Sequence, residues 1–327
     1  MNTTATRRLN RPSSRGLLCL PVVLAAVWLL ATALPAAAQA PGGALRLTLD
    51  IGKPQVVVGE PVYATLTLTN TSKQSQPVFP DLYPEVGVGA VAISYQGRSA
   101  LFVPIGVDDV ETQVSELAPG QSISATFAIF YGAGGWTFPA PGSYQLTGHY
   151  RHPSLGEDRE LRSEPVTLNV AAGGPAGDLL TEDSKAGDEA GLFMLWEGGD
   201  HLRRGIAHLE TLIERYPEQI QADYARLALG LSLSRGFRDY SIGKVRPPDY
   251  QRSRALLSRL GRAPLQPFSA LQLQLALARI GLALNDTPQA QASADRASAI
   301  VQDRPAFADR LDLAVEVEPR LGPLLKR

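Results

Sequence analysis

The hydrophobic residues of this chain change their spacing once, near Ala172. Before that point, apolar and aromatic residues recur at every second position in short runs, which is the period of a strand with one buried face. After it they recur every three to four positions, as on the buried face of a helix. We therefore predict a β-rich N-terminal half and a helical C-terminal half, with the boundary near Ala172.

Seven alternating runs, separated by turns rich in glycine, proline and asparagine, fill the N-terminal half without a long helical run. This pattern favours an antiparallel β-sandwich of immunoglobulin-like type over residues 44–172. In the sixth run Tyr144, Leu146, Gly148 and Tyr150 should share one face, and Tyr144 is placed to tie a corner with its hydroxyl. The runs are LRLTLDI, PVYATLTLTNTS, AVAISYQG, ALFVPIGV, ISATFAIFYG, GSYQLTGHYRH and PVTLNV.

The order of turns and strands in this half carries a family resemblance. NTS, then APGQS, a phenylalanine-bearing strand and PGSYQLTGHY follow one another. This order resembles small bacterial immunoglobulin-like domains, among them the intracellular proteinase inhibitor family, over roughly residues 60 to 152. The resemblance implies the sandwich fold more than inhibition, and no inhibitory residue carries over from it.

The glycine cluster in FYGAGGWTFPAPG, residues 130–142, looks at first like a phosphate-binding loop. Such a loop needs a helix start directly after its glycines, whereas Trp136, Phe138 and two prolines follow here. We predict a glycine-rich hairpin or bulge instead. Its aromatic residues either cover the end of the core and contact another domain, or anchor a peptide, glycan or neighbouring domain. Tyr131, Trp136 and Phe138 are therefore candidate partner-binding residues.

The helical half, residues 188–327 after a predicted linker at 173–187, contains an internal repeat. Ile280-Gly281, Leu284, Ser293, Ala297, Ile300 and Pro305 fall at spacings that resemble the tetratricopeptide repeat, a helical hairpin. Gly230 begins an earlier copy 51 residues before Gly281. The usual period is about 34, so an insertion of roughly 17 residues is expected between them. The resemblance implies about three stacked repeats whose concave face takes an extended peptide or another protein.

A basic group surrounds the expected insertion. Between Arg235 and Arg262 eight arginines and lysines face only Asp239 and Asp249. The group is either a solvated face or an anionic docking surface, for which the acidic N-terminal half of the same chain is one candidate occupant. The candidate partner-binding residues here are Arg235, Arg238, Arg246, Arg252, Arg254 and Arg259.

Residues 1–38 read as a signal peptide. Arg7, Arg8, Arg11 and Arg15 precede an apolar stretch, and small residues allow cleavage after Ala38. An uncleaved membrane anchor is the alternative interpretation. Cys19 is the only cysteine, so a mature chain would have no disulfide and no thiol nucleophile. A periplasmic or secreted bacterial protein is the expectation.

Familiar catalytic motifs are absent from the sequence. There is no G-x-S-x-G elbow, nucleotide fingerprint or calcium loop, and the four histidines do not match the HExxH spacing. Asp108, Asp109 and Glu111 form a small acidic cluster that we expect to be a solvated loop. We predict no catalytic residue, no metal site and no cofactor, and the acidity of the N-terminal half argues against nucleic acid as a partner.

These observations favour an exported, non-enzymatic bacterial protein of the cell envelope that acts as a scaffold or binds a protein or peptide partner. Two alternatives remain open. A protease-inhibitor-like binding module is motivated by the N-terminal resemblance. An envelope enzyme is possible because a pair of catalytic carboxylates is defined in space and not in sequence.

Overall fold

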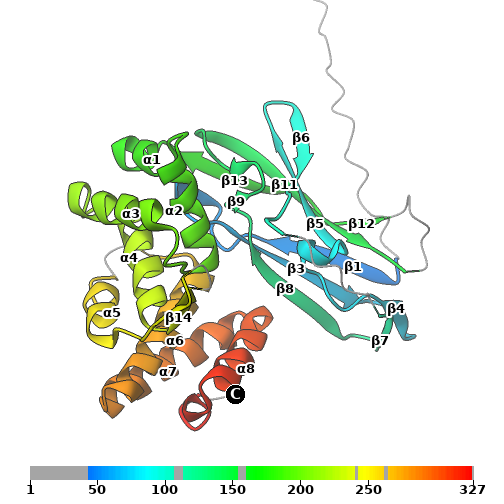
Figure 1. Cartoon of the computed structure of the whole chain (residues 1–327). Helices are drawn as coiled ribbons and strands as arrows, with labels where there is room; N and C mark the ends of the chain where they lie inside the picture. Colours follow the sequence, from blue (N-terminus) through cyan, green and yellow to red (C-terminus); the bar gives the residue numbers. More distant parts are fainter. Residues whose placement is uncertain (1–42, 107–112, 154–159, 240–241, 261–263, 326–327) are drawn as a thin grey trace, which may run out of the picture. The chain divides into compact units, whose positions relative to one another are not determined.

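The computed structural model describes residues 43–106, 113–153, 160–239, 242–260 and 264–325. The predicted signal peptide, Cys19 and the acidic cluster at 108–111 lie outside these ranges. Residues Gln39–Arg327 form one compact unit, distinct from Met1–Ala38. Within it, strands occupy the N-terminal half and helices the C-terminal half, as predicted (Figure 1).

Two main sheets make up the β-rich half. The smaller sheet has the order β1-β3-β8 and the larger the order β2-β13-β11-β5-β6, with β12 also paired to β11. Each predicted run overlaps one of these strands, although ALFVPIGV shares only Ala100 and Leu101 with β6. The strands are β1 (Leu45–Asp50), β2 (Gln55–Val57), β3 (Tyr63–Asn70), β5 (Gly89–Tyr95), β6 (Arg98–Leu101), β8 (Ser122–Ala128), β11 (Gly142–Arg151), β12 (Glu160–Arg162) and β13 (Val166–Ala171).

The two sheets share one core. Leu45, Leu47 and Leu49 of β1 alternate with exposed residues, as a strand with one wet face requires. On β11 the predicted face of Tyr144, Leu146, Gly148 and Tyr150 is buried, which confirms the prediction. A Cβ atom at Gly148 would lie only 2.6 Å from Leu66 of the other sheet, so glycine permits this close approach.

Both predictions for the turns around β11 are confirmed. The hydroxyl of Tyr144 donates to the backbone oxygen of Ala140 at 2.8 Å. The glycine cluster forms a hairpin of β9 (Tyr131–Gly132) and β10 (Gly135–Trp136), in which Gly135 adopts a positive φ of 84°. A second short pair joins β4 (Gln76–Val78) to β7 (Ser115–Leu117), and the 3-10 helix η1 spans Pro84–Val86.

The C-terminal half consists of successive helices with one short hairpin, β14 (Phe237–Asp239) and β15 (Lys244–Arg246), inside the predicted insertion. None of the helices in the described ranges is long and apolar enough to cross a bilayer. The helices are α1 (Gly174–Leu180), α2 (Lys185–Trp196), α3 (Arg203–Arg215), α4 (Ile220–Leu233), α5 (Tyr250–Leu257), α6 (Pro267–Ala283), α7 (Thr287–Asp303), α8 (Ala308–Val317), and the 3-10 turns η2 (Pro305–Phe307) and η3 (Pro319–Leu321).

Helices α6 and α7 form a tight antiparallel pair. A Cβ atom at Gly281 would lie 2.7 Å from the backbone nitrogen of Ala290, so the two backbones approach closely only because Gly281 has no side chain. Asp286 caps α7, since its carboxylate accepts from the backbone N-H of Gln289 at 3.3 Å. Residues 284–286 form the short connection between the two helices.

The segment 173–187, predicted as a linker, instead holds α1 and the start of α2. Ala176, Gly177 and Leu180 of α1 are buried. Gln221 of α4 donates to the backbone oxygens of Val58, at 2.9 Å, and Gly173, at 3.2 Å. Glycines of this segment permit close packing, since a Cβ atom at Gly173 would lie only 2.6 Å from the backbone oxygen of Val58.

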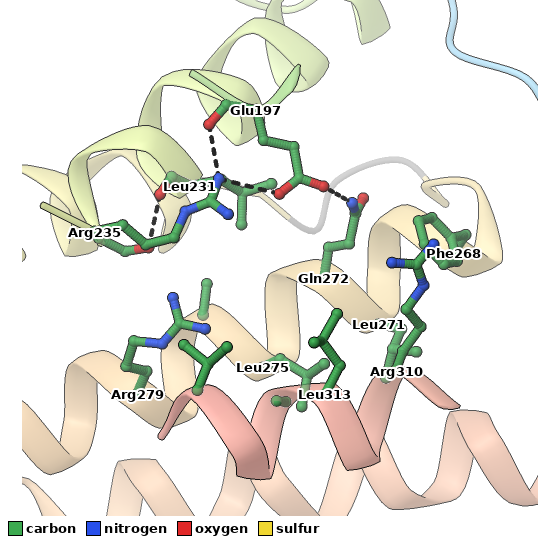
Figure 2. Close-up of a pocket in the computed structure, with 14 residues that line it drawn as sticks. Glu197, Leu231, Arg235, Phe268, Leu271, Gln272, Leu275, Arg279, Arg310 and Leu313 are labelled. Atoms are coloured by element: carbon green, nitrogen blue, oxygen red, sulfur yellow. Dashed lines mark hydrogen bonds and ion pairs between the residues drawn. The ribbon is translucent and has the colours of Figure 1, made fainter. Parts of the chain in front are cut away.

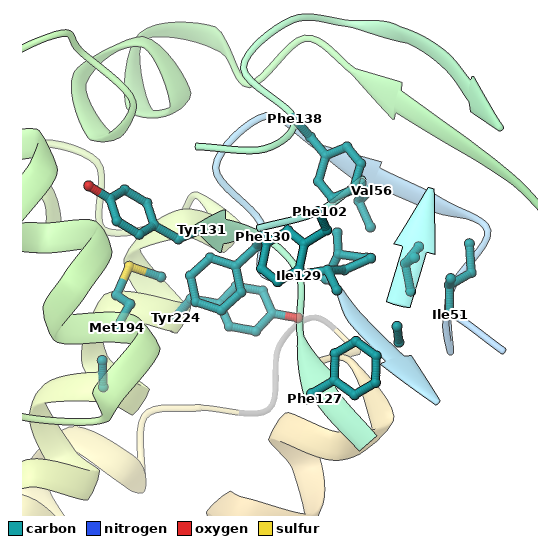
Figure 3. Close-up of a cluster of buried hydrophobic side chains, with 14 of the residues drawn as sticks. Ile51, Val56, Phe102, Phe127, Ile129, Phe130, Tyr131, Phe138, Met194 and Tyr224 are labelled. Atoms are coloured by element: carbon teal, nitrogen blue, oxygen red, sulfur yellow. The ribbon is translucent and has the colours of Figure 1, made fainter. Parts of the chain in front are cut away.

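A buried carboxylate lies where the two halves meet. Glu60 accepts from Lys53 at 2.5 Å, from the backbone N-H of Val57 at 3.2 Å and from the hydroxyl of Tyr224 on α4 at 3.2 Å. That hydroxyl in turn accepts from the backbone N-H of Gln266 at 2.7 Å. Phe130 and Tyr131 of the β-rich half pack in the same hydrophobic cluster as Met194 and Tyr224 of the helical half (Figure 3).

The contact predicts the stability of one variant. Tyr224→Phe removes a buried hydroxyl and leaves the Gln266 N-H and the Glu60 carboxylate each one partner short. We expect the free energy of unfolding to fall by about 1–3 kcal/mol. Urea unfolding followed by tryptophan fluorescence measures it, and a single transition is expected because the two halves share a core.

The matched control is Tyr216→Phe, whose hydroxyl makes no hydrogen bond to any described residue. It should leave the free energy of unfolding almost unchanged. Equal losses in the two variants would contradict a special role for the Tyr224 hydroxyl.

Candidate functional site

A groove runs between α4, α6 and α8 in the helical half (Figure 2). Its cavity volume is about 160 Å³, and four leucines are among the residues that line it. Leu271 and Leu275 come from α6, Leu313 from α8 and Leu231 from α4. Leu313 is 48% exposed, so the groove presents apolar surface to solvent.

One carboxylate and three guanidinium groups line the groove. Glu197 ends α2 in the left-handed conformation, with φ of 53°. Its backbone oxygen accepts from Arg235 at 2.8 Å, and its carboxylate accepts from Arg235 at 3.2 Å and from the side chain of Gln272. The carboxylate of Glu197, at the edge of the groove, therefore already has hydrogen-bond partners within the chain.

Arg310 is held by the β-rich half. It donates to the backbone oxygen of Thr126 at 3.1 Å, and its guanidinium lies 5.0 Å from the ring centroid of Phe268. A stacked guanidinium with a carbonyl partner is well fixed. Arg310 adds positive charge to the groove; one of its terminal nitrogens is held, whereas its Nε atom is buried without a hydrogen-bond partner.

Arg279 differs from the other two arginines. Its guanidinium rises from α6 into the space beneath Arg235 (Figure 2). Among the described residues it has no hydrogen-bond or ion-pair partner, and its Nε atom is buried without one. Burial, followed by the positive charge of Arg235, lowers the pKa of Arg279. Arg310 also has a buried Nε without a partner, but Arg279 alone among the three arginines has no hydrogen bond or ion pair to any described residue.

This arrangement suits a ligand with an anion beside apolar groups. A guanidinium presents donors in a fork that matches a carboxylate or phosphate, and the leucines offer surface for an attached apolar part. Within the described ranges no three histidine, cysteine, aspartate or glutamate side chains gather in a way that would hold a metal ion.

The three aromatic candidates of the β-rich half lie together but in different environments. Tyr131 is buried, its ring fills the space beside Gly191 of α2, and its hydroxyl donates to Asp188 at 3.1 Å. Burial, with the nearby Asp188, raises the pKa of Tyr131 to about 12. Phe138 is buried against Tyr144, whereas Trp136 is half-buried at the rim of a separate pocket. Only Trp136 offers surface to an external partner.

Four of the six arginine candidates pair with acids from other parts of the helical half. Arg235 pairs with Glu197, Arg246 with Asp200 at 2.7 Å, Arg252 with Glu210 at 2.7 Å and Arg254 with Asp286 at 3.6 Å. Arg238 has an interaction partner as well, and Arg259 is exposed. Of the six, Arg235 alone lines the groove.

Sequence reasoning missed Arg279 and Arg310. A count of charge along the sequence identifies neither of them, because Arg279 is a single arginine in an apolar segment and Arg310 lies between Asp309 and Asp312. The available signal for Arg279 was its place in LQLQLALARIGLAL, where one cation interrupts a helix that is otherwise apolar and amide-bearing. An ionisable residue on a largely buried helix indicates a partner or a ligand.

Comparisons with known proteins give partial similarities. No family model and no curated protein matches the chain. A β-glucosidase from Listeria innocua in complex with glucose is 13% identical over 39% of this chain and 16% of that chain, with a TM-score of 0.24. The sporulation control protein Spo0M from Bacillus subtilis is 12% identical over 43% of this chain and 54% of that chain, with a TM-score of 0.27. A CARDB domain from Pyrococcus furiosus, in complex with di-metal ions, is 14% identical over 38% of this chain and 91% of that chain, with a TM-score of 0.21.

The state of Arg279 predicts an unusual effect on stability. Arg279→Met keeps the apolar stem but removes a half-buried charge and a buried N-H without a partner. We expect the free energy of unfolding to stay constant or rise by about 1 kcal/mol, because ligand-binding residues are often kept at a cost to stability. Thermal and urea unfolding of the ligand-free protein measure the change.

Arg246→Met serves as the control, because Arg246 pairs with Asp200 and also donates to the backbone oxygen of Ser232 at 3.1 Å. We expect the free energy of unfolding of Arg246→Met to fall by about 1–3 kcal/mol. A similar loss in Arg279→Met would mean that Arg279 stabilises the fold and is not reserved for a ligand.

Proposed function

We propose that this protein is an exported, non-enzymatic binding protein of the bacterial cell envelope, which holds a segment of a partner protein in the groove between α4, α6 and α8. The single observation that carries the proposal is Arg279, a half-buried guanidinium that points into an apolar groove without a partner among the described residues. Leaving such a group without a partner costs about 1–3 kcal/mol, which an anionic ligand would recover.

The size of the groove favours a protein segment over a free small molecule. Pockets that enclose drug-sized ligands measure roughly 300–1,000 Å³. The cavity here, about 160 Å³, has room for a few side chains only. A short anchor that belongs to a larger partner fits it, because the remainder of the partner can contact the helix surface outside.

Several finer features belong to the same proposal. The β-rich half is an immunoglobulin-like sandwich, and the helical half is built from tetratricopeptide-like hairpins, of which α6 and α7 are the best example. The basic N-terminus, apolar stretch and small residues of positions 1–38 direct the chain to the periplasm or the exterior. The absence of familiar catalytic motifs from the sequence supports binding over catalysis.

Site-specific cross-linking in the native envelope tests the proposal. A photoreactive phenylalanine analogue at Leu313, inside the groove, should yield a covalent adduct with one partner, and mass spectrometry should place the linkage in a segment that carries aspartate or glutamate. The same analogue at Arg296, exposed on α7 and outside the groove, serves as the control. A synthetic peptide of the linked segment should then bind the purified chain.

Removal of the cation should weaken that peptide. Arg279→Met should raise its Kd by about tenfold to a hundredfold, since hydrogen bonds to charged groups contribute about 1.5–3 kcal/mol. Arg296→Gln should leave the Kd unchanged. Adducts equally abundant at both positions, or turnover of a substrate in the groove, would overturn the proposed function.

A further inference from the structure

The larger sheet has an open edge along β6. Among the described residues β6 pairs with β5 alone, and it is the last strand of the sheet (Figure 1). All four of its residues are exposed. An unpaired strand edge presents a row of N-H and C=O groups to any chain that can run beside it.

The register of the β5-β6 hairpin identifies the free groups. Tyr95 pairs with Arg98 across the two-residue turn, and the N-H of Phe102 donates to Val91 at 2.8 Å. In an antiparallel ladder the backbone N-H and C=O groups of every second residue point to the same neighbouring strand. The backbone groups of Arg98, Ala100 and Phe102 therefore point toward β5. The N-H and C=O groups of Ser99 and Leu101 therefore point away from the sheet.

The next residue of that parity already has a bond on this side. The backbone oxygen of Val103 accepts from the N-H of Ala133, in the β9-β10 hairpin, at 2.9 Å. The outward side of this strand therefore already takes part in one backbone hydrogen bond, at Val103. Two further residues, Ser99 and Leu101, are available to extend the same ladder.

An aromatic pocket lies beside this edge. Its cavity volume is about 410 Å³, and β6, the β9-β10 hairpin and Tyr144 line it. Tyr95 stacks on Tyr144 at a centroid distance of 4.2 Å and donates its hydroxyl to Pro141, so that wall of the pocket is rigid. Trp136 packs edge-on against the ring of Tyr131, at a centroid distance of 5.5 Å, and also lines the pocket.

The charge and exposure of the residues around β6 indicate which kind of segment could bind beside the strand. Arg98 lines the pocket, and in the described part of the chain no carboxylate pairs with it. Leu101 and Val103 are each 56% exposed on and just after the strand. A strand added at this edge would cover these apolar side chains and place an acidic residue beside Arg98.

We propose that β6 receives an extended segment of a partner protein by strand addition. The segment bonds through its backbone to Ser99 and Leu101, sets an apolar or aromatic side chain into the pocket between Tyr95 and Trp136, and carries an acidic residue opposite Arg98. This surface is distinct from the helical groove, and it gives the predicted contact role of Trp136 a specific ligand.

The edge fits two alternative roles less well. A charged residue on a short edge strand commonly discourages pairing between sheets. That role needs no pocket, whereas here an aromatic pocket of about 410 Å³ adjoins the strand. Pairing with a second copy through Ser99 and Leu101 would place Arg98 of one copy opposite Phe102 of the other, so Arg98 would find no acidic partner there.

A proline substitution tests the inference. Random 12-residue peptides displayed on phage are selected on the purified full chain, and the enriched sequences are synthesised. They should carry apolar residues at alternate positions and an acid. Ser99→Pro removes an outward N-H without touching the β5 ladder, and it should weaken binding at least about tenfold, as expected for the loss of roughly 1.4 kcal/mol.

Ser99→Ala is the matched control. It removes the hydroxyl that bonds Ser94 at 2.9 Å but keeps the backbone N-H, so it should bind the peptides like the parent chain. Peptides N-methylated at alternate amides should fail to bind the unaltered chain, and this measurement stays valid even where the proline variant unfolds. Arg279→Met should bind as the parent does, which separates this inference from the function of the groove.

The inference is overturned by peptides that bind Ser99→Pro normally, by N-methylated peptides that keep their affinity, or by a selection that enriches no sequence. Sedimentation of the chain gives a further decisive result. A dimer that Ser99→Pro converts to a monomer would identify a second copy as the occupant and exclude the partner segment.

Discussion

The buried carboxylate of Glu60 is the contact on which the arrangement of this protein depends. A carboxylate inside a protein is tolerated only where several donors surround it. Glu60 finds them in Lys53 and Val57 of its own half and in Tyr224 of the helical half. Because a residue from each half is needed to satisfy it, the β-rich and helical halves stabilise each other at this point, and the hydrophobic cluster around it belongs to both.

This shared core explains what the halves contribute to the candidate site. Thr126, on β8, accepts a hydrogen bond from Arg310 and thereby fixes one wall of the helical groove. The groove is thus positioned partly by a sheet residue, although its lining comes from helices. In the other direction, Asp188 of α2 accepts a hydrogen bond from Tyr131 and so anchors the β9-β10 hairpin, which begins at that residue.

Local chemistry made much of the fold predictable from the sequence. Burial on one side of a strand enforces alternation, so each of the seven runs marked a strand, and the pattern also gave the buried face of Tyr144 and Tyr150 on β11. Residue types that favour one local conformation, such as glycine in turns and aspartate at helix starts, were equally informative. Gly135 supplies the positive φ of a hairpin, and Asp286 accepts a cap hydrogen bond.

Interactions between distant segments could not be predicted in this way. Arg246 and Asp200 are separated by 46 positions, and only the packing of the helices brings them together. For the same reason the charge count around the insertion overstated its free positive charge. Arg279 was missed because nothing near it in sequence shows that α4 and α8 leave its guanidinium without a partner.

The backbone of Glu197 shows what the groove demands of the fold. A non-glycine residue in the left-handed region carries a strain of about 1–2 kcal/mol that glycine would not. Stability alone would favour glycine at the end of α2, but glycine has no carboxylate to hold Arg235 and Gln272 at the edge of the groove. Glu197 therefore lowers the stability of the end of α2 but fixes the side chains at the edge of the groove. Glycine at this position would relieve the strain and leave Arg235 and Gln272 without their shared carboxylate.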